Sequence, residues 1–110
     1  MTTKYRLEEG MELMKEQMPQ VMDPFGNLMN QVTQDGLLTA KTKRLMMVAV
    51  AVTQRCHQCI RAHVKAALEL GASRAEILEA TGVAILMAGG PALAHVATVV
   101  LEVLDEHGAS

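Results

Sequence analysis

Apolar side chains recur at helical spacing along most of the chain. The first stripe predicts an amphipathic helix over residues 7–18, which Pro19 interrupts. A second, short helix is predicted to follow Asp23, the expected N-cap, with Pro24 in its first position, and to end before the Asp35-Gly36 turn. The apolar stripes of these two helices consist of Leu7, Met11, Met14 and Met18, and of Phe25, Leu28, Met29 and Val32.

The third predicted helix is the most hydrophobic part of the chain. Thr39 is its expected cap, and the helix is predicted over residues 40–54. Its centre, residues 45–52, is apolar all round, so we expect it to be buried on every side. A buried strand is the competing interpretation, but the alanines, the methionines and the total length favour a helix.

Glycines and capping residues mark the remaining helices. A fourth helix is predicted over residues 56–70, with Gly71 closing it in the left-handed conformation. Ser73 and Glu76 form a capping box that opens a fifth helix. The Gly89-Gly90-Pro91 segment ends that helix and begins the last one. It also divides a long apolar stretch into two pieces, each too short to cross a membrane.

Composition supports an all-α fold of about six helices. Half of the residues are hydrophobic, but Tyr5 and Phe25 are the only aromatic ones, so the core must come from Leu, Val, Ala, Ile and the nine Met. Such side chains suit close helix packing better than a β-sandwich. A length of 110 residues fits one domain, residues 1–110. The small apolar side chains late in the chain predict a surface covered by other subunits, and so a homo-oligomer.

Charge and cysteine usage narrow the functional classes. The net charge is −2, and the scattered basic residues with no stacking aromatics argue against nucleic-acid binding. Residues 1–6 are not followed by the apolar stretch of a secretory signal. Two cysteines close together do not make the disulfide framework of a secreted domain, so we expect the cytoplasm. There a Cys-x-x-Cys pair is catalytic or binds metal more often than it is structural.

The segment from Cys56 through Cys59 to His63 carries the candidate chemistry. On a helix, these three positions share one face, with His63 one turn beyond Cys59. The first turn of a helix favours a thiolate, and the histidine can accept the thiol proton or pair with the thiolate. Cα atoms three residues apart on a helix lie about 5 Å from each other, which a disulfide tolerates. The pattern therefore predicts redox chemistry, in which one sulfur attacks a peroxide and the other condenses with the resulting sulfenic acid.

Two other interpretations of this segment stay open. Zinc could take Cys56, Cys59 and His63 as ligands, with His57 or water as the fourth, although the chain offers no second ligand pair. Alternatively, the thiols and the histidine carry no chemistry at all. Of the other histidines, we expect His57 on the surface, His95 satisfied in the core or an interface, and His107 at a helix end.

The Cys-x-x-Cys-x-x-x-His motif and the following segment HVKAALELGASRAEILEA resemble the AhpD-like alkylhydroperoxidase branch of the carboxymuconolactone decarboxylase superfamily. The resemblance runs from about residue 41 to residue 104. It implies an all-α fold, obligate trimers or hexamers with sites near subunit contacts, and a peroxiredoxin-type oxidoreductase. Hydroperoxides would be reduced by a thiol or dithiol, with no metal or cofactor. It also implies that Cys59 attacks the peroxide, that Cys56 forms the disulfide and meets the reductant, and that His63 relays protons.

One position departs from the resembled pattern. Arg44 stands where the relay usually has a glutamate, twelve residues before the first cysteine. Arginine cannot act as a base near neutral pH, so it either stabilises a thiolate by its charge or lies on the surface. The relay could run through another carboxylate, or be absent and leave weak peroxidase activity. A lactone decarboxylase and a non-catalytic redox-sensing or oligomeric binding protein are the alternative functions. The substitute carboxylates considered are Glu69, Glu76 and Glu79.

Overall fold

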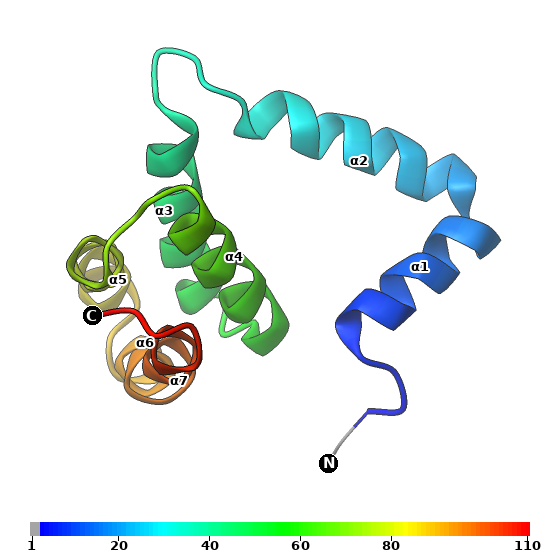
Figure 1. The fold of residues 1–110 in the computed structure, drawn as a ribbon. Helices are drawn as coiled ribbons and strands as arrows, with labels where there is room; N and C mark the ends of the chain where they lie inside the picture. The colour runs from blue at the N-terminus through cyan, green and yellow to red at the C-terminus, as the bar shows by residue number, and fades with distance from the viewer. Residues whose placement is uncertain (1–2) are drawn as a thin grey trace. The chain divides into compact units, whose positions relative to one another are not determined.

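The computed structural model describes residues 3–110, and this part of the chain is all-α, as predicted (Figure 1). Residues 1 and 2, which belong to the stretch considered for a secretory signal, lie outside the described residues. The chain divides into two compact units, Met1–Gln34 and Asp35–Ser110, and its assignment as a single domain stays a prediction. The helices are α1 Leu7–Gln17, α2 Pro19–Thr33, α3 Ala40–Thr53, α4 His57–Glu69, α5 Arg74–Ala88, α6 Gly90–His95, the π-helical η1 Val96–Val100 and α7 Leu101–Glu106.

The first unit holds α1 and α2, which meet at Met18. The prediction that the second helix follows an Asp23 cap is wrong, because α2 begins at Pro19 and Pro24 lies inside it. The amides of Val21 and Met22 already donate to the Met18 carbonyl, so the helix is established before Pro24 is reached. A proline at this depth removes a single helical hydrogen bond, and the rest of the helix compensates for that loss.

Neither helix of the first unit buries a side chain completely. The apolar stripes that the sequence predicts are present, but Phe25, Leu28 and Val32 are each more than half exposed. None of the residues described in this unit, 3–34, is buried, so they form no apolar core that would stabilise the unit alone.

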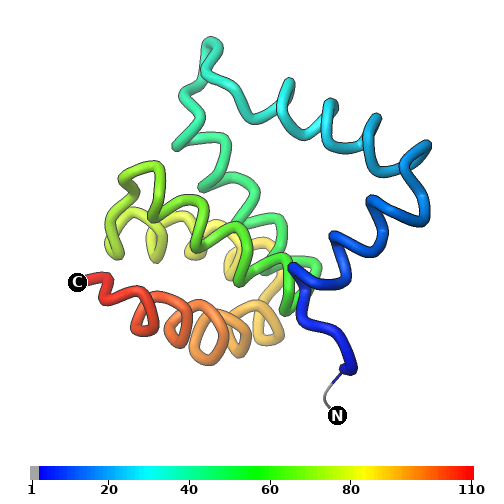
Figure 2. The backbone as a smooth tube through the Cα atoms, turned by 45° about the vertical axis from the view of Figure 1, so that its right-hand side comes forward, coloured from blue at the N-terminus to red at the C-terminus, as the bar shows by residue number. Residues whose placement is uncertain are grey.

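The second unit contains the aliphatic core. Helix α3 packs against α4 and α5, and the C-terminal helical stretch packs against α4 through η1 and α7 (Figure 2). One face of α3 departs from the expectation of complete burial, since Met46 and Val50 are each 53% exposed. The helix is apolar all round, but only part of its surface has a neighbour within the chain. The fully buried larger side chains are Val48, Val52, Ile60, Val64, Ile77, Thr81, Val100, Val103 and Leu104.

The last three segments form one continuous helical stretch with a π-helical turn at its centre. The apolar pattern did not reveal this turn. Two arginines hold the end of the stretch: Arg61 on α4 pairs with Glu102 and Glu106, and Arg74 on α5 pairs with Asp105. No helix within residues 3–110 has the length and hydrophobicity to cross a membrane.

Three predicted caps are confirmed. The Thr39 hydroxyl accepts from the Thr42 amide, and Ser73 and Glu76 bond each other's backbone amides in a capping box. Gly71 has a φ of 91° and closes α4. There the Ala72 amide donates to the Ala67 carbonyl, and the Gly71 amide to Leu68, which is the Schellman pattern.

Helix α3 ends in the same pattern without a glycine. The Cys56 amide donates to the Ala51 carbonyl at 3.2 Å, and the Arg55 amide donates to Val52 at 3.1 Å. Arg55 occupies the left-handed position, with a φ of 55°. It is the only non-glycine residue with positive φ in the described part of the chain. The turn that delivers Cys56 to α4 is therefore built on a strained residue.

Exchanging residue types at these two turns tests that strain. We expect Arg55→Gly to raise the free energy of unfolding by roughly 0.5–1 kcal/mol, because glycine adopts positive φ without a Cβ penalty. We expect Gly71→Arg to lower it by about 1–2 kcal/mol. No heavy atom lies within 4 Å of a Cβ built on Gly71, so that loss would come from the backbone rather than from a clash. Urea denaturation at one fixed protein concentration measures both changes.

Gln54→Gly is the matched control, because Gln54 has an ordinary φ of −82°. Glycine there gains no conformational relief and should destabilise the fold. A loss of stability in Arg55→Gly as large as that in Gln54→Gly would contradict the strain at Arg55.

Candidate functional site

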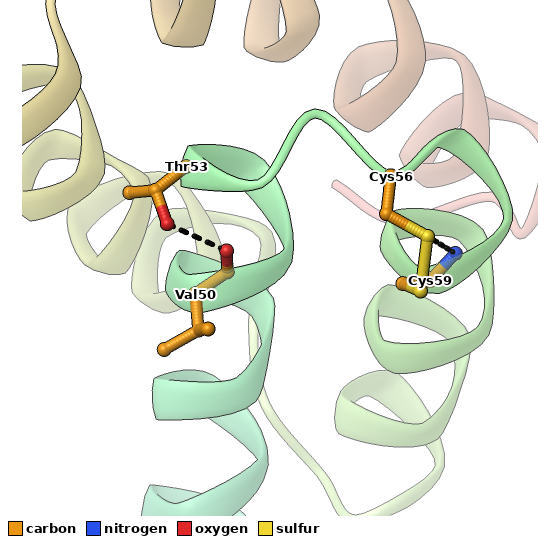
Figure 3. Close-up of a disulfide and its surroundings, with 4 residues drawn as sticks. All are labelled: Val50, Thr53, Cys56 and Cys59. Atoms are coloured by element: carbon orange, nitrogen blue, oxygen red, sulfur yellow. Dashed lines mark hydrogen bonds between the residues drawn. A yellow bond between two sulfur atoms is a disulfide. The ribbon is translucent and has the colours of Figure 1, made fainter.

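Cys56 lies at the junction of two helices. It follows the left-handed residue that ends α3, and it is the N-cap of α4. Its Sγ accepts a hydrogen bond from the Cys59 amide at 3.2 Å, so the sulfur lies at the positive end of a 13-residue helix (Figure 3). Amides in the first turn of a helix have no carbonyl partner within the helix, and they favour a negatively charged group. The sequence predicts that Cys56 lies in the first turn of this helix. The structure places it one position earlier, at the N-cap.

The two cysteines form a disulfide. Their Cα atoms lie 5.2 Å apart, in agreement with the separation expected from helical spacing. Both residues are partly buried. The geometry that the sequence predicts for a reversible dithiol pair is present, because the backbone already holds the sulfurs at bonding distance.

The end of α3 borders this pair. Val50 and Thr53 lie in the surroundings of the disulfide, and the Thr53 hydroxyl donates to the Val50 carbonyl at 2.7 Å (Figure 3). The Thr53 hydroxyl proton is therefore used in a bond to the backbone. Val50 is 53% exposed, and its side chain points away from the sulfurs, on the far side of α3 (Figure 3).

His63 lies on α4, four residues after Cys59, and is partly buried. Nη1 of Arg44, on α3, lies 3.1 Å from Nδ1 of the His63 ring. A guanidinium has donors and no acceptor, so Arg44 donates and Nδ1 accepts. Burial lowers the pKa of His63 below its usual range, and the nearby charge of Arg44 lowers it further.

Arg44 therefore does not simply lie on the surface, one of the two roles expected for it. It is partly buried, and its Nε is a buried donor with no hydrogen-bond partner. Nothing in the sequence pairs Arg44 with His63, because they are nineteen residues apart on different helices. Helical spacing shows which residues share a face of one helix. It does not show how α3 and α4 are aligned against each other, and this alignment brings Arg44 next to His63.

The carboxylates considered as substitutes lie elsewhere. Glu76 accepts from the Ser73 amide and pairs with Lys41 at 3.1 Å. The Ser73 backbone bond, followed by Lys41, lowers the pKa of Glu76. Glu69 and Glu79 are exposed on their helices. The His63 ring is thus bonded to a cation at the position where a relay would use a carboxylate.

The remaining histidines are placed separately. His57 is exposed, as predicted. His95 donates from Nδ1 to the Pro91 carbonyl, and His107 donates from Nδ1 to Val103, each at 2.9 Å. Across residues 3–110, no three His, Cys, Asp or Glu side chains are grouped as metal ligands would be. Cysteines joined in a disulfide cannot supply thiolate ligands, so the zinc interpretation has no support in this arrangement.

Comparison with known proteins extends the description of the fold. A curated relative from Paracoccus denitrificans, called uncharacterized protein 4 in cox locus, is 46% identical over 84 residues, which cover 76% of this chain and 75% of the relative. The crystal structure of a carboxymuconolactone decarboxylase family protein from Legionella pneumophila matches with a TM-score of 0.84 and 38% identity. The match covers 88% of this chain and 86% of that one.

A second solved structure comes from Thermotoga maritima and has a TM-score of 0.72 at 35% identity. It covers 78% of this chain and 88% of that one, and its description suggests involvement in the antioxidative response. The sequence profile of the carboxymuconolactone decarboxylase family matches residues 19–102, which is most of the chain. This protein therefore belongs to the carboxymuconolactone decarboxylase family.

Proposed function

We propose that this protein is a thiol-dependent peroxidase that reduces hydroperoxides through Cys56 and Cys59. The observation that carries the proposal is the disulfide at the N-terminus of α4, with His63 one turn beyond Cys59 on the same helix. The suggested antioxidative role of the Thermotoga maritima protein supports the same chemistry. The pair can gain and lose a disulfide with little backbone motion, because its Cα atoms are already 5.2 Å apart.

The reaction uses the two sulfurs in sequence. The Cys59 thiolate attacks the terminal oxygen of the hydroperoxide, and an S–O bond forms as the O–O bond breaks. The alkoxide takes a proton and leaves as an alcohol. The Cys56 thiolate then attacks the sulfenic sulfur of Cys59 and expels hydroxide, which leaves as water after protonation. Two electrons pass from the two thiols to the peroxide, and the two thiol protons end in the alcohol and the water.

The helix cap suits this division of roles. In the reduced protein, the Cys59 amide that bonds the Cys56 sulfur would stabilise a thiolate at Cys56. Cys56 would thus be ready to attack the sulfenic acid as soon as it forms. A thiol or dithiol reductant then restores the pair by exchange at Cys56 and becomes a disulfide itself. A reducing compartment such as the cytoplasm would supply that reductant.

We also propose that the protein acts as a homo-oligomer, a trimer or a hexamer. Exposed apolar side chains support this. No residue between 3 and 34 is buried, and in the second unit Leu86 is 82% exposed and Met87 is 77% exposed. Large exposed apolar side chains, when they gather on a surface, mark an interaction site in a folded protein. A second copy of the chain carries complementary apolar surface of the same type.

Cysteine substitutions test the peroxidase and the roles of the two sulfurs. With a dithiol reductant, we expect Cys59→Ser to reduce peroxide consumption to the uncatalysed rate, because it removes the attacking sulfur. Cys56→Ser should also abolish turnover, but it should consume about one equivalent of peroxide per chain and leave a sulfenic acid at Cys59. Consumption is followed by peroxide assay, and the sulfenic acid by a dimedone adduct in mass spectrometry.

His57→Gln is the control, because His57 is exposed and adjacent to the pair. It should keep wild-type turnover. Wild-type turnover in Cys59→Ser would refute the peroxidase proposal. Decarboxylation of a lactone by the cysteine-free double variant would favour the lyase of the family's name instead.

The oligomer has its own test. We expect Leu86→Glu combined with Met87→Glu to produce a smaller species in sedimentation equilibrium, because burying two carboxylates in an apolar interface is strongly unfavourable. Lys65→Glu, an exposed change on α4, is the control and should leave the mass unchanged. A wild-type protein that sediments as a monomer at micromolar concentration would rule the oligomer out.

A further inference from the structure

We infer that Arg44 is a positioning residue that fixes His63 as a neutral ring protonated on Nε2, so that His63 serves Cys59 as a hydrogen-bond donor and not as a proton relay. This inference rests on the proposed peroxidase function for its chemical meaning. Its structural basis is the 3.1 Å contact between Arg44 Nη1 and His63 Nδ1.

The tautomer follows from donor and acceptor rules. The guanidinium can only donate, so Nδ1 must present its lone pair to Arg44. A neutral imidazole carries one N–H, which must then be on Nε2. Nδ1 is therefore occupied, and Nε2 has no lone pair to receive a proton. In this state the ring can donate a hydrogen bond, but it cannot accept the thiol proton from Cys59.

The charged groups around His63 favour this state. Helices α3 and α5, the π-turn η1 and α7 pack against α4, and within residues 3–110 the charged side chain bonded to the His63 ring is that of Arg44. The carboxylates of α5 and α7 that lie near basic groups are paired with Lys41, Arg61 or Arg74 instead. A protonated ring would place a second cation against Arg44, in a partly buried site. The charged residues on these helices are Lys41, Lys43, Arg44, Arg61, Lys65, Glu69, Arg74, Glu76, Glu79, Glu102, Asp105 and Glu106.

The consequence for Cys59 is a fixed source of positive potential. A hydrogen bond from Nε2–H to the thiolate would be strengthened by the guanidinium on the other side of the ring, because bonds in a chain polarise one another. A glutamate at position 44 would do the opposite: it would accept from Nδ1–H and favour the imidazolium. The arginine thus replaces a titrating relay with a donor whose charge does not change near neutral pH.

The buried Nε of Arg44 bears on whether Arg44 serves function or stability. A buried donor without a partner opposes folding, so Arg44 is not held in place for stability alone. We expect Arg44→Met, which keeps most of the aliphatic stem, to leave the urea midpoint unchanged or to raise it. The same variant should slow the reaction of Cys59 with peroxide about tenfold at neutral pH, because the thiolate loses the positive potential of the guanidinium.

Nitrogen NMR of the histidine rings tests the inference without reference to activity. In the reduced wild-type protein, we expect His63 to show a bare Nδ1 and a protonated Nε2, and to titrate below the ordinary value of about 6.5. Arg44→Met should move the titration back toward that value. Arg44→Glu should move it higher still and shift the proton to Nδ1. Arg44→Lys keeps the cation and should retain the wild-type tautomer, while the His57 signals should not move in any variant.

The pH dependence of stability has a definite sign. Because the pKa of His63 is lowered in the folded protein, the unfolded chain binds the proton more tightly. The free energy of unfolding should therefore fall as the pH drops below about 6.5, until the folded ring is also protonated. Arg44→Met should weaken this acid dependence. Single-turnover peroxide reduction by Arg44→Glu should gain a histidine-dependent limb that the wild-type pH profile lacks.

The two proposals fail in different ways. A proton on Nδ1 of His63 in the reduced wild type, or a titration at or above 6.5, would overturn the role of Arg44 even if peroxide is consumed normally. Full peroxide consumption by Cys59→Ser would overturn the peroxidase while the tautomer result still stood.

Discussion

The site depends on one tight connection between two helices. The Schellman end of α3 places Cys56 directly at the N-terminus of α4, so a single residue ends one helix and caps the next. This short connection has two consequences. The sulfur receives the Cys59 amide, and the second cysteine, one turn later, lies within disulfide distance. Arg55 adopts a left-handed conformation so that this connection can form, and the backbone strain is thus located immediately beside the reactive pair.

Two sources of positive charge act on the site. Positive potential reaches the sulfurs from the N-terminus of α4 at Cys56, and from Arg44 through the His63 ring in the arrangement we infer. Neither source depends on a proton that is exchanged near neutral pH. The reactivity of a thiol pair tuned in this way would follow only the titration of its own thiols, whereas a histidine–carboxylate relay also loses its function when either member changes protonation state.

Exposed apolar surface connects the fold to assembly. None of the described residues of the first unit is buried, and in the second unit Met46 and Val50 lie on the exposed face of α3. In the homo-oligomer that we propose, a neighbouring copy of the chain would remove this surface from water.

The sequence by itself determined the local structure. Thr39, Ser73 and Gly71 fixed helix ends because caps act within a few residues, and the spacing of Cys56, Cys59 and His63 fixed one helix face. The sequence did not predict that α2 begins before Pro24, at Pro19. It also did not predict the Schellman turn at Arg55, because that turn contains no glycine. Only the tertiary structure decided the partner of His63, because the contact with Arg44 depends on the register of two packed helices. That register is set by side-chain packing in the core, which no periodicity along one segment can encode.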